Sequence, residues 1–334
     1  MINERLFKHY GIDTNKNLGI PSVCGRPYDT LLIDKMGSCF ACECQEWLPQ
    51  SVGNLLKSSL QEILQSPMRK RLQDSVSNGS YRYCNSRLCT YISKNCFPHG
   101  DLNKGLRQLR LAIDDSCNLS CPSCRKEKIF LYKGGTFRLR MRIMDRVLEF
   151  MRTREEPLLI HIGSDGDPFA SVLYRAFMKK APDRDCFTYS LQTNGLLFKQ
   201  MFPRVRHVIS RTKNINVSID GATAETYEKL RRGGQWTKIK ENLLFIGENK
   251  GMGYKFEMHM VVQKSNWHEM ADMLSLARDV GADKVNFTRL ADWGTFDKFS
   301  SQQPPYESAE FNKLLESCEK DPLGHTWLDD DLLL

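Results

Sequence analysis

The 334-residue sequence contains no long hydrophobic run, and this excludes a membrane-spanning helix. Such a helix needs roughly 20 consecutive apolar residues, and no segment approaches that length. The first thirteen residues are polar and lack the apolar centre of a secretion signal. Internal repeats and low-complexity tracts are also absent. These absences predict a globular cytoplasmic protein without a membrane partner.

Charge of one sign does not dominate, because 48 Lys and Arg face 40 Asp and Glu and leave a net charge of +8. A basic balance occurs in nucleic-acid-binding proteins, and equally in proteins that bind acidic partners or anionic substrates. The densest basic stretch, residues 138–154, has the apolar spacing of a helix and reads as a solvated helix face. The charge therefore gives little support for binding to nucleic acid.

Cysteine is abundant, and its distribution is uneven. Ten of the twelve cysteines lie between residues 24 and 124. In a chain without a secretion signal, clustered cysteines indicate metal binding more often than disulfides. Thiolate sulfur is a soft ligand that suits zinc and iron–sulfur clusters. The sequence therefore predicts at least one thiolate metal site.

The residue pattern changes near residue 105. Residues 1–104 form a cysteine-rich region with few strand signals, residues 105–300 alternate strand and helix patterns, and residues 301–334 read as a C-terminal helical tail. Six strands are expected, at residues 109–113, 158–162, 187–192, 215–219, 255–262 and 284–288. They predict an α/β fold with a parallel sheet, and six units are fewer than the eight of a closed barrel. We therefore predict a partial (β/α)6 barrel, with ligands at the carboxyl ends of its strands.

Directly after the first of these strands the sequence reads DDSCNLSCPSCR, which places Cys117, Cys121 and Cys124 in one short loop. Three sulfurs do not complete a structural zinc site, which takes four ligands. They do suit a cubane cluster that keeps one iron open for another ligand. A zinc knuckle completed by a fourth cysteine or histidine is the alternative.

This C-x3-C-x2-C loop resembles the signature of the radical S-adenosylmethionine (SAM) superfamily. The resemblance implies a 4Fe-4S cluster on the three cysteines, SAM as a second cofactor, and a 5′-deoxyadenosyl radical that abstracts hydrogen from a substrate. The residue before the last cysteine is usually aromatic in this family, whereas here it is Ser123. The contact to adenine would then come from Phe130 or from the backbone.

Further positions match the family after the later strands. Asp165-Gly166-Asp167-Pro168 resembles its G-G-E-P-like turn, which engages the methionine amino group, and Thr193-Asn194-Gly195 is also family-like. The resemblance implies cofactor contacts for Asp165, Gly166, Asp167, Ser218, Asp220, Arg231 and Asn266, with Arg232 as the alternative to Arg231. Both arginines equally suit a solvated helix end, and Asn266 a helix N-cap. Asp292 and Trp293 are candidates for the substrate pocket, although a Trp is more often part of a core.

The N-terminal region resembles the SPASM/twitch extension of radical SAM enzymes, which binds auxiliary clusters. The resemblance rests on the spacing of Cys24, Gly37 and Cys42, on an amphipathic helix expected over 60–72, and on the later pair Cys84 and Cys89. Most relatives carry this extension after the barrel, whereas here it precedes it. Few cysteines follow in the later part of this region, and this favours a single 4Fe-4S cluster. Its expected ligands are Cys24, Cys42, Cys84 and Cys89, with Cys39, Cys44 and Cys96 as alternatives. A structural zinc site on the same thiolates is the competing hypothesis.

The resemblance implies an oxidoreductase or modifying enzyme that cleaves SAM reductively. A peptide or protein side chain is the favoured substrate, because SPASM/twitch relatives often modify peptides. A dehydrogenase of a small sugar or cyclitol alcohol is the alternative, and a zinc protein that binds nucleic acid is a remote one. An acidic flavodoxin or ferredoxin is the expected electron donor, steered by the positive net charge.

Overall fold

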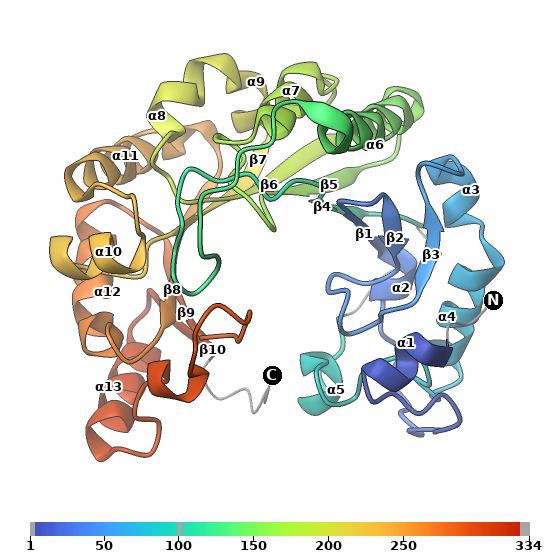
Figure 1. Ribbon diagram of the computed structural model, residues 1–334, viewed down its shortest axis with the longest axis horizontal. Coiled ribbons are helices and arrows are strands. Elements are labelled where there is room, and N and C mark those ends of the chain that lie inside the picture. The colour runs from blue at the N-terminus through green and yellow to red at the C-terminus, as the bar shows by residue number, and fades with distance from the viewer. Residues whose placement is uncertain (1–3, 99–101, 104, 328–334) are drawn as a thin grey trace.

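The computed structural model describes residues 4–98, 102–103 and 105–327. Its centre is a ten-stranded sheet with the strand order β10-β9-β8-β7-β6-β5-β4-β1-β2-β3. The sheet curves around an open centre, and most of the helices lie on its outside (Figure 1). The strands are β1 (Thr30–Asp34), β2 (Ser38–Phe40), β3 (Ser51–Asn54), β4 (Gln108–Ala112), β5 (Leu158–Ile162), β6 (Phe187–Thr193), β7 (Thr212–Ser218), β8 (Lys255–Val262), β9 (Lys284–Arg289) and β10 (Gly324–Trp327).

The strands from β4 to β9 pair in parallel and in chain order, with helices between them. This arrangement confirms the predicted α/β fold with a partial barrel. The helices of this part are α6 (Gly134–Thr153), α7 (Val172–Lys180), α8 (Phe198–Met201), α9 (Arg206–Ile209), α10 (Ala224–Leu230), α11 (Trp236–Glu248) and α12 (Met270–Asp279). Because the strands are parallel, their carboxyl ends meet at one edge of the sheet, where ligands bind in such folds.

The two faces of the sheet differ in polarity. In β8 the side chains of Phe256, Met258 and Met260 are fully buried, whereas those of Glu257 and His259 between them are only half-buried. A parallel sheet covered by helices on both faces has near-continuous apolar strands instead. The alternation therefore shows that one face packs against the helices, while the other faces the open centre and is largely polar.

The N-terminal region contributes to the same sheet, which corrects the expectation of few strands there. Strand β1 pairs in parallel with β4, and β2 and β3 continue the sheet in antiparallel fashion. These strands are three to five residues long, and β1 is buried at four of its five positions without an alternating pattern. Their pairing depends on tertiary contacts with β4, which local periodicity does not show. The sheet thus runs across the predicted boundary at residue 104.

The amphipathic helix expected over 60–72 is two helices, α3 (Leu60–Leu64) and α4 (Pro67–Ser77). Pro67 occupies the first turn of α4, and the side chain of Ser66 caps that helix by accepting a hydrogen bond from the Arg69 amide. Proline is tolerated in the first turn of a helix and not in its interior, so the break falls at this point. The remaining helices of the N-terminal region are α1 (Glu4–His9), α2 (Arg26–Asp29) and α5 (Thr90–Ser93).

The C-terminal segment is not purely helical, which corrects the predicted helical tail. It contains α13 (Ala309–Lys320) and then β10, which pairs in parallel with β9 and extends the sheet. The strand has only four residues and starts with Gly324, so it carries no strand signal of its own. Among the described helices none is both long and apolar enough to cross a membrane.

Candidate active site and auxiliary cluster site

One cavity gathers most of the predicted site residues at the carboxyl ends of β4 to β7. Its volume is about 130 Å³, and it is partly open to solvent. Its lining combines the cysteine loop after β4, the turn after β5, the end of β6 and the end of β7, namely Cys117, Leu119, Cys121, Cys124, Arg125, Gly163, Ser164, Asp165, Gly166, Asp167, Gln192, Thr193, Asn194, Ser218 and Arg231. Segments up to 114 residues apart in the chain therefore meet here, between Cys117 and Arg231.

Each of the three cysteine sulfurs faces a hydrogen-bond donor. The Asn194 side-chain amide donates to Cys117 Sγ over 3.6 Å, and Arg231 Nη1 donates to Cys121 Sγ over 3.8 Å. Arg125 Nε donates to Cys124 Sγ over 3.4 Å. Donors around all three sulfurs favour thiolates over neutral thiols.

Burial disfavours the free thiolates. It raises the pKa of Cys117 to about 11 and also raises the pKa of Cys121. A metal displaces the proton from such a thiol, so metal binding and deprotonation go together here. The donors and the burial together fit a cluster held by Cys117, Cys121 and Cys124.

No three His, Cys, Asp or Glu side chains converge as ligands of one metal ion within the described ranges. In a cubane cluster each cysteine binds a different iron, so the cysteines surround the cluster and do not meet at one point. The arrangement of the three cysteines around one cavity is therefore compatible with a cluster.

The turn after β5 packs so closely that two of its positions require glycine. A Cβ atom on Gly163 would lie 2.1 Å from the Gln192 carbonyl oxygen, and the φ angle of Gly163 is +100°. A Cβ atom on Gly166 would lie 2.5 Å from the carbonyl oxygen of Ser116, in the segment just before Cys117. The glycines therefore let the turn contact both the cysteine loop and the end of β6.

We expect replacement of Gly166 by Ala to push the turn away from the cysteine loop. The added methyl group would overlap backbone atoms, and overpacking of this kind costs roughly 1–3 kcal/mol. Chemical denaturation of the purified protein should show this loss of stability. Gly135→Ala is the matched control, because a Cβ atom there meets nothing within 4 Å, and it should leave the stability unchanged or slightly raised. Equal stabilities of the two variants would contradict the close-packing argument.

Asp167 links the turn to the end of β6 and leaves no oxygen free for a ligand. Its Oδ2 accepts hydrogen bonds from the Thr193 hydroxyl over 2.7 Å and from the Asn194 amide over 2.9 Å. Its Oδ1 accepts hydrogen bonds from the Phe169 and Ala170 amides. This buried carboxylate therefore stabilises the conformation of the turn, and the backbone of the turn lines the cavity. Asp165 is exposed and lies at the rim.

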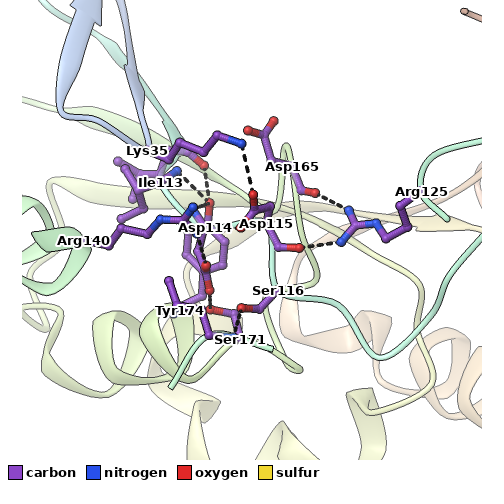
Figure 2. Close-up of polar contacts among 12 residues, drawn as sticks. Lys35, Ile113, Asp114, Asp115, Ser116, Arg125, Arg140, Asp165, Ser171 and Tyr174 are labelled. Atoms are coloured by element: carbon purple, nitrogen blue, oxygen red, sulfur yellow. Dashed lines mark hydrogen bonds and ion pairs between the residues drawn. The ribbon is translucent and has the colours of Figure 1, made fainter. Parts of the chain in front are cut away.

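An ion-pair network that is buried at Arg140 and Asp114 fixes the segment that leads into Cys117 (Figure 2). Arg140 on α6 lies 2.7 Å from Asp114 and 2.6 Å from Asp115, and Lys35 lies 3.0 Å from Asp115. Burial by itself raises the pKa of Asp115, but the hydrogen bonds from Arg140 and Lys35 outweigh this effect and lower it to about 2. Because Lys35 belongs to the turn between β1 and β2, the N-terminal region contacts the cysteine loop directly through Asp115.

Arg125, the residue after the last cysteine, joins three parts of the site. Besides its contact to Cys124, its guanidinium donates to the carbonyl oxygens of Asp115 and Asp165 (Figure 2). One side chain thus joins both ends of the cysteine loop to the turn after β5. Sequence reasoning missed this role, since an arginine at a loop end carries no signal of its partners.

Arg231 and Asp220 form a buried pair beside Cys121. Arg231 Nε lies 2.9 Å from Asp220 Oδ2, and the other carboxylate oxygen accepts a hydrogen bond from the Val261 amide. Asp220 therefore engages the protein with both oxygens and does not line the cavity. Arg231 does line it, as does Ser218 at the end of β7. Arg232 instead bonds Ser120 and the Lys126 carbonyl oxygen.

Asn266 does not reach the cavity. Its side chain is fully buried, and its amide donates to the carbonyl oxygens of Asp220 and Val261, both over 2.9 Å. Its Oδ1 accepts a hydrogen bond from the Gln263 amide. All polar atoms of this side chain are used to connect the ends of β7 and β8, so the structure gives no support to a direct cofactor contact.

The aromatic candidates lie at the surface. Trp293 is 66% exposed, Asp292 beside it is exposed, and neither lines the cavity. Phe130 is 55% exposed and lines a neighbouring hollow together with Asn118 and Tyr132. Phe130 could contact an adenine in the cavity only if this hollow were continuous with it. The cavity and the hollow share no lining residue among the described ones, so the structure does not support this contact.

A second, smaller and more enclosed cavity of about 20 Å³ lies in the N-terminal region. Cys24, Cys42, Cys84 and Cys89 all line it, among apolar and aromatic side chains such as Leu48, Val76, Tyr81, Ile92 and Phe97. The alternative cysteines lie elsewhere: Cys39 is buried and bonds the Gly37 carbonyl oxygen, Cys44 bonds Glu46, and Cys96 is exposed. Four soft ligands around one small, mostly apolar cavity suit an iron–sulfur cluster or zinc.

Comparison with known proteins agrees with this picture. The model of the SPASM family, an iron–sulfur cluster-binding domain, matches residues 24–96. GTP 3′,8-cyclase of Staphylococcus carnosus (strain TM300) is 26% identical over 204 residues, which cover 58% of this chain and 56% of the relative. AdoMet-dependent heme synthase of Methanosarcina barkeri (strain Fusaro / DSM 804) is 25% identical over 210 residues, with 63% and 56% covered.

These similarities support a radical SAM enzyme with a SPASM region. This confirms the resemblance seen in the sequence, with the SPASM region before the barrel. The cofactors of this family are a 4Fe-4S cluster and SAM, and the SPASM region adds an iron–sulfur site. The enzyme spans little more than half of the length of these curated relatives.

Solved structures of lower similarity include other proteins with SAM bound. Streptococcus suis SuiB bound to S-adenosylmethionine has a TM-score of 0.45 and 13% identity, covering 63% of this enzyme and 46% of SuiB. Native anSMEcpe with AdoMet and the Cp18Cys peptide has a TM-score of 0.45 and 17% identity, covering 64% and 60%.

Proposed function

We propose that this radical SAM enzyme cleaves SAM at the cavity of Cys117, Cys121 and Cys124 and uses the product to abstract hydrogen from a peptide or protein side chain. The observation that carries the proposal is the meeting of the three cysteines with the turn 163–168 and the ends of β6 and β7 around one cavity. When bound, the reduced cluster supplies the electron that splits the sulfonium of SAM into methionine and a 5′-deoxyadenosyl radical.

The residues of the chain hold and orient these groups. Cys117, Cys121 and Cys124 are the cluster ligands in this proposal, and Arg125 and Arg231 keep positive charge beside two of the sulfurs. Hydrogen bonds and charge near cluster sulfurs set the reduction potential. The backbone of the turn 163–168, held in shape by Asp167, faces the cavity and offers polar groups to the methionine part of SAM. Ser218 and Gln192 add side-chain polar groups from the strand ends.

In the N-terminal region, Cys24, Cys42, Cys84 and Cys89 are the proposed ligands of one auxiliary 4Fe-4S cluster. The SPASM match over residues 24–96 includes all four of them. The same match supports a peptide substrate, since enzymes with SPASM regions often act on peptides. An acidic flavodoxin or ferredoxin remains the proposed electron donor, on the basis of the net charge of +8.

A small molecule is the second candidate substrate, and one observation favours it. The curated relatives are named as a GTP cyclase and a heme synthase, and these names describe small-molecule reactions. The two candidates differ in a property that is simple to measure, because a peptide substrate is destroyed by proteases and a small metabolite is not.

We expect the anaerobically reconstituted enzyme to release 5′-deoxyadenosine and methionine in equal amounts from SAM when dithionite is the reductant. Mass spectrometry of the products measures this cleavage without knowledge of the substrate. An extract of the source cells that contains the substrate should then increase 5′-deoxyadenosine formation. Loss of this stimulation after proteinase K treatment of the extract indicates a peptide, and its persistence indicates a small molecule. Absence of any cleavage by enzyme with a full complement of iron would contradict the proposed function.

A further inference from the structure

Arg110 lies on the inner face of the sheet, below the cysteine loop. It is the third residue of β4, paired in register with Leu32 of β1 on one side and His161 of β5 on the other. Its chain neighbours Leu109 and Leu111 are fully buried in the core that packs against the helices. Successive side chains of a strand point to opposite faces, so the half-buried Arg110 faces the open centre.

Arg110 has no anionic partner in the described part of the chain. Its Nε is buried without a hydrogen-bond partner, and its guanidinium forms no ion pair there. Most other buried arginines have a carboxylate partner: Arg140 contacts Asp114 and Asp115, Arg231 contacts Asp220, and Arg26 contacts Glu43 at 3.4 Å. Arg69 forms no ion pair among the described residues, but its guanidinium donates to the carbonyl oxygens of Leu64 and Tyr28 over 2.9 and 2.6 Å. A partly buried charge without a partner is costly. The other buried arginines thus have carboxylate or carbonyl partners within the protein, and the lack of either for Arg110 in the described ranges indicates a role outside folding.

The surroundings of Arg110 strengthen its attraction for an anion. Leu32, Phe40 and Ala112 form a small apolar cluster on the same face, which limits the access of water. Coulomb attraction grows as the effective dielectric constant falls.

The neighbouring histidine adds neither a second cation nor an anion. Burial, and then the charge of Arg110, lower the pKa of His161 to about 3, so its imidazole is neutral near pH 7. Its Nε2 lies 3.3 Å from Gln108 Oε1. Neutral polar groups therefore flank Arg110, and Arg26, the other cation that acts on His161, is paired with Glu43.

We propose that Arg110 binds an oxyanion of the substrate, a carboxylate or a phosphate. The planar guanidinium matches both groups with two parallel hydrogen bonds. Arg110 is two residues before the end of β4, and therefore about 7 Å below the strand end that leads into the cysteine loop. A substrate anchored there extends toward the cavity of Cys117. The proposal rests on the proposed function and narrows its substrate to molecules with such a group, whether an acidic peptide or a small anionic metabolite.

The test measures anion binding without turnover. The reconstituted enzyme, saturated with SAM so that the methionine site is filled, is titrated with inorganic phosphate or with glutarate at constant ionic strength set by chloride. Isothermal titration calorimetry should show binding of at least one of the two probes to the wild type, and the tighter one identifies the class. Arg110→Gln should weaken this binding at least about tenfold, which corresponds to the lower end of a charge-assisted hydrogen bond. Arg110→Lys keeps the positive charge but lacks the planar guanidinium, so its affinity for the probe should lie between those of the wild type and Arg110→Gln.

Arg142→Gln is the matched control, because Arg142 lies exposed on α6 and should bind the probe like the wild type. Equal affinities of Arg110→Gln and Arg142→Gln would overturn the proposal, as would a wild type that prefers neither probe to chloride. A tenfold loss of SAM affinity in Arg110→Gln would assign Arg110 to the cofactor and also overturn it. Since the release of 5′-deoxyadenosine by the wild type is measured separately, failure of anion binding leaves the proposed function standing, and failure of cleavage does not affect the binding result.

Discussion

A variant with Cys117, Cys121 and Cys124 replaced by Ala is expected to lose all cleavage of SAM. The three sulfurs come from one loop, line one cavity, and each faces a hydrogen-bond donor that suits a thiolate. Without them no cysteine remains among the described residues that line this cavity. The iron content should fall by about four per chain, the content of one cubane cluster. Production of 5′-deoxyadenosine with dithionite should become undetectable.

The control variant carries Ala at Cys96 and Cys186, two cysteines that line neither cavity. It should retain the iron content and the cleavage activity of the wild type. Circular dichroism separates loss of the cluster from loss of the fold, because most of the apolar core lies outside the cysteine loop, which contributes only Leu119 and Cys121 and the partly buried Cys117. An unchanged iron content in the triple variant would refute the ligand assignment, whatever its activity.

The barrel strands were predictable because their signal is local. In β5 the buried residues Leu158, Ile160 and Ile162 alternate with less buried ones, and the predicted bounds of this strand match the observed bounds. Strands β1 to β3 were not predictable, because their short segments become strands only where β4 offers an edge. The break at Pro67 was visible in the sequence, since Ser followed by Pro is a common start of a helix.

The site was predictable to a different extent for each kind of residue. The cysteine loop and the turn 163–168 are continuous in sequence, so their spacing already indicated one site. The roles of polar residues were not readable, because a residue type does not specify its partner. Asp167 and Asn266 form their hydrogen bonds with the protein itself. Arg125 became a candidate site residue only through its observed contacts, and Arg110 only through its lack of a partner.

The auxiliary site gives the second large expected effect. A variant with Cys24, Cys42, Cys84 and Cys89 replaced by Ala should lose about four irons per chain and keep the iron at the barrel. The four cysteines come from three segments of the N-terminal region, and their cavity is lined mostly by apolar and aromatic side chains, with Arg26 as a charged neighbour. A cluster at this position ties these segments together, and the energy of metal binding contributes directly to folding. We therefore expect the N-terminal region to lose more than roughly 4 kcal/mol of stability, beyond the usual range of point substitutions.

Metal analysis combined with chemical denaturation under anaerobic conditions tests this expectation. Cys39→Ala is the matched control: Cys39 is fully buried in the same region but bonds the Gly37 carbonyl oxygen and lies outside the cavity, so its loss should cost about 1 kcal/mol and no iron. The complementary variant, with Ala at Cys117, Cys121 and Cys124, should still hold about four irons. Zinc in place of iron in that variant would mean that the same four thiolates form a structural zinc site. Equal iron content and stability in the four-cysteine variant and in Cys39→Ala would show that the cavity holds no metal, and its cysteines would then be packing residues only, because a bound cluster cannot survive the loss of all its protein ligands.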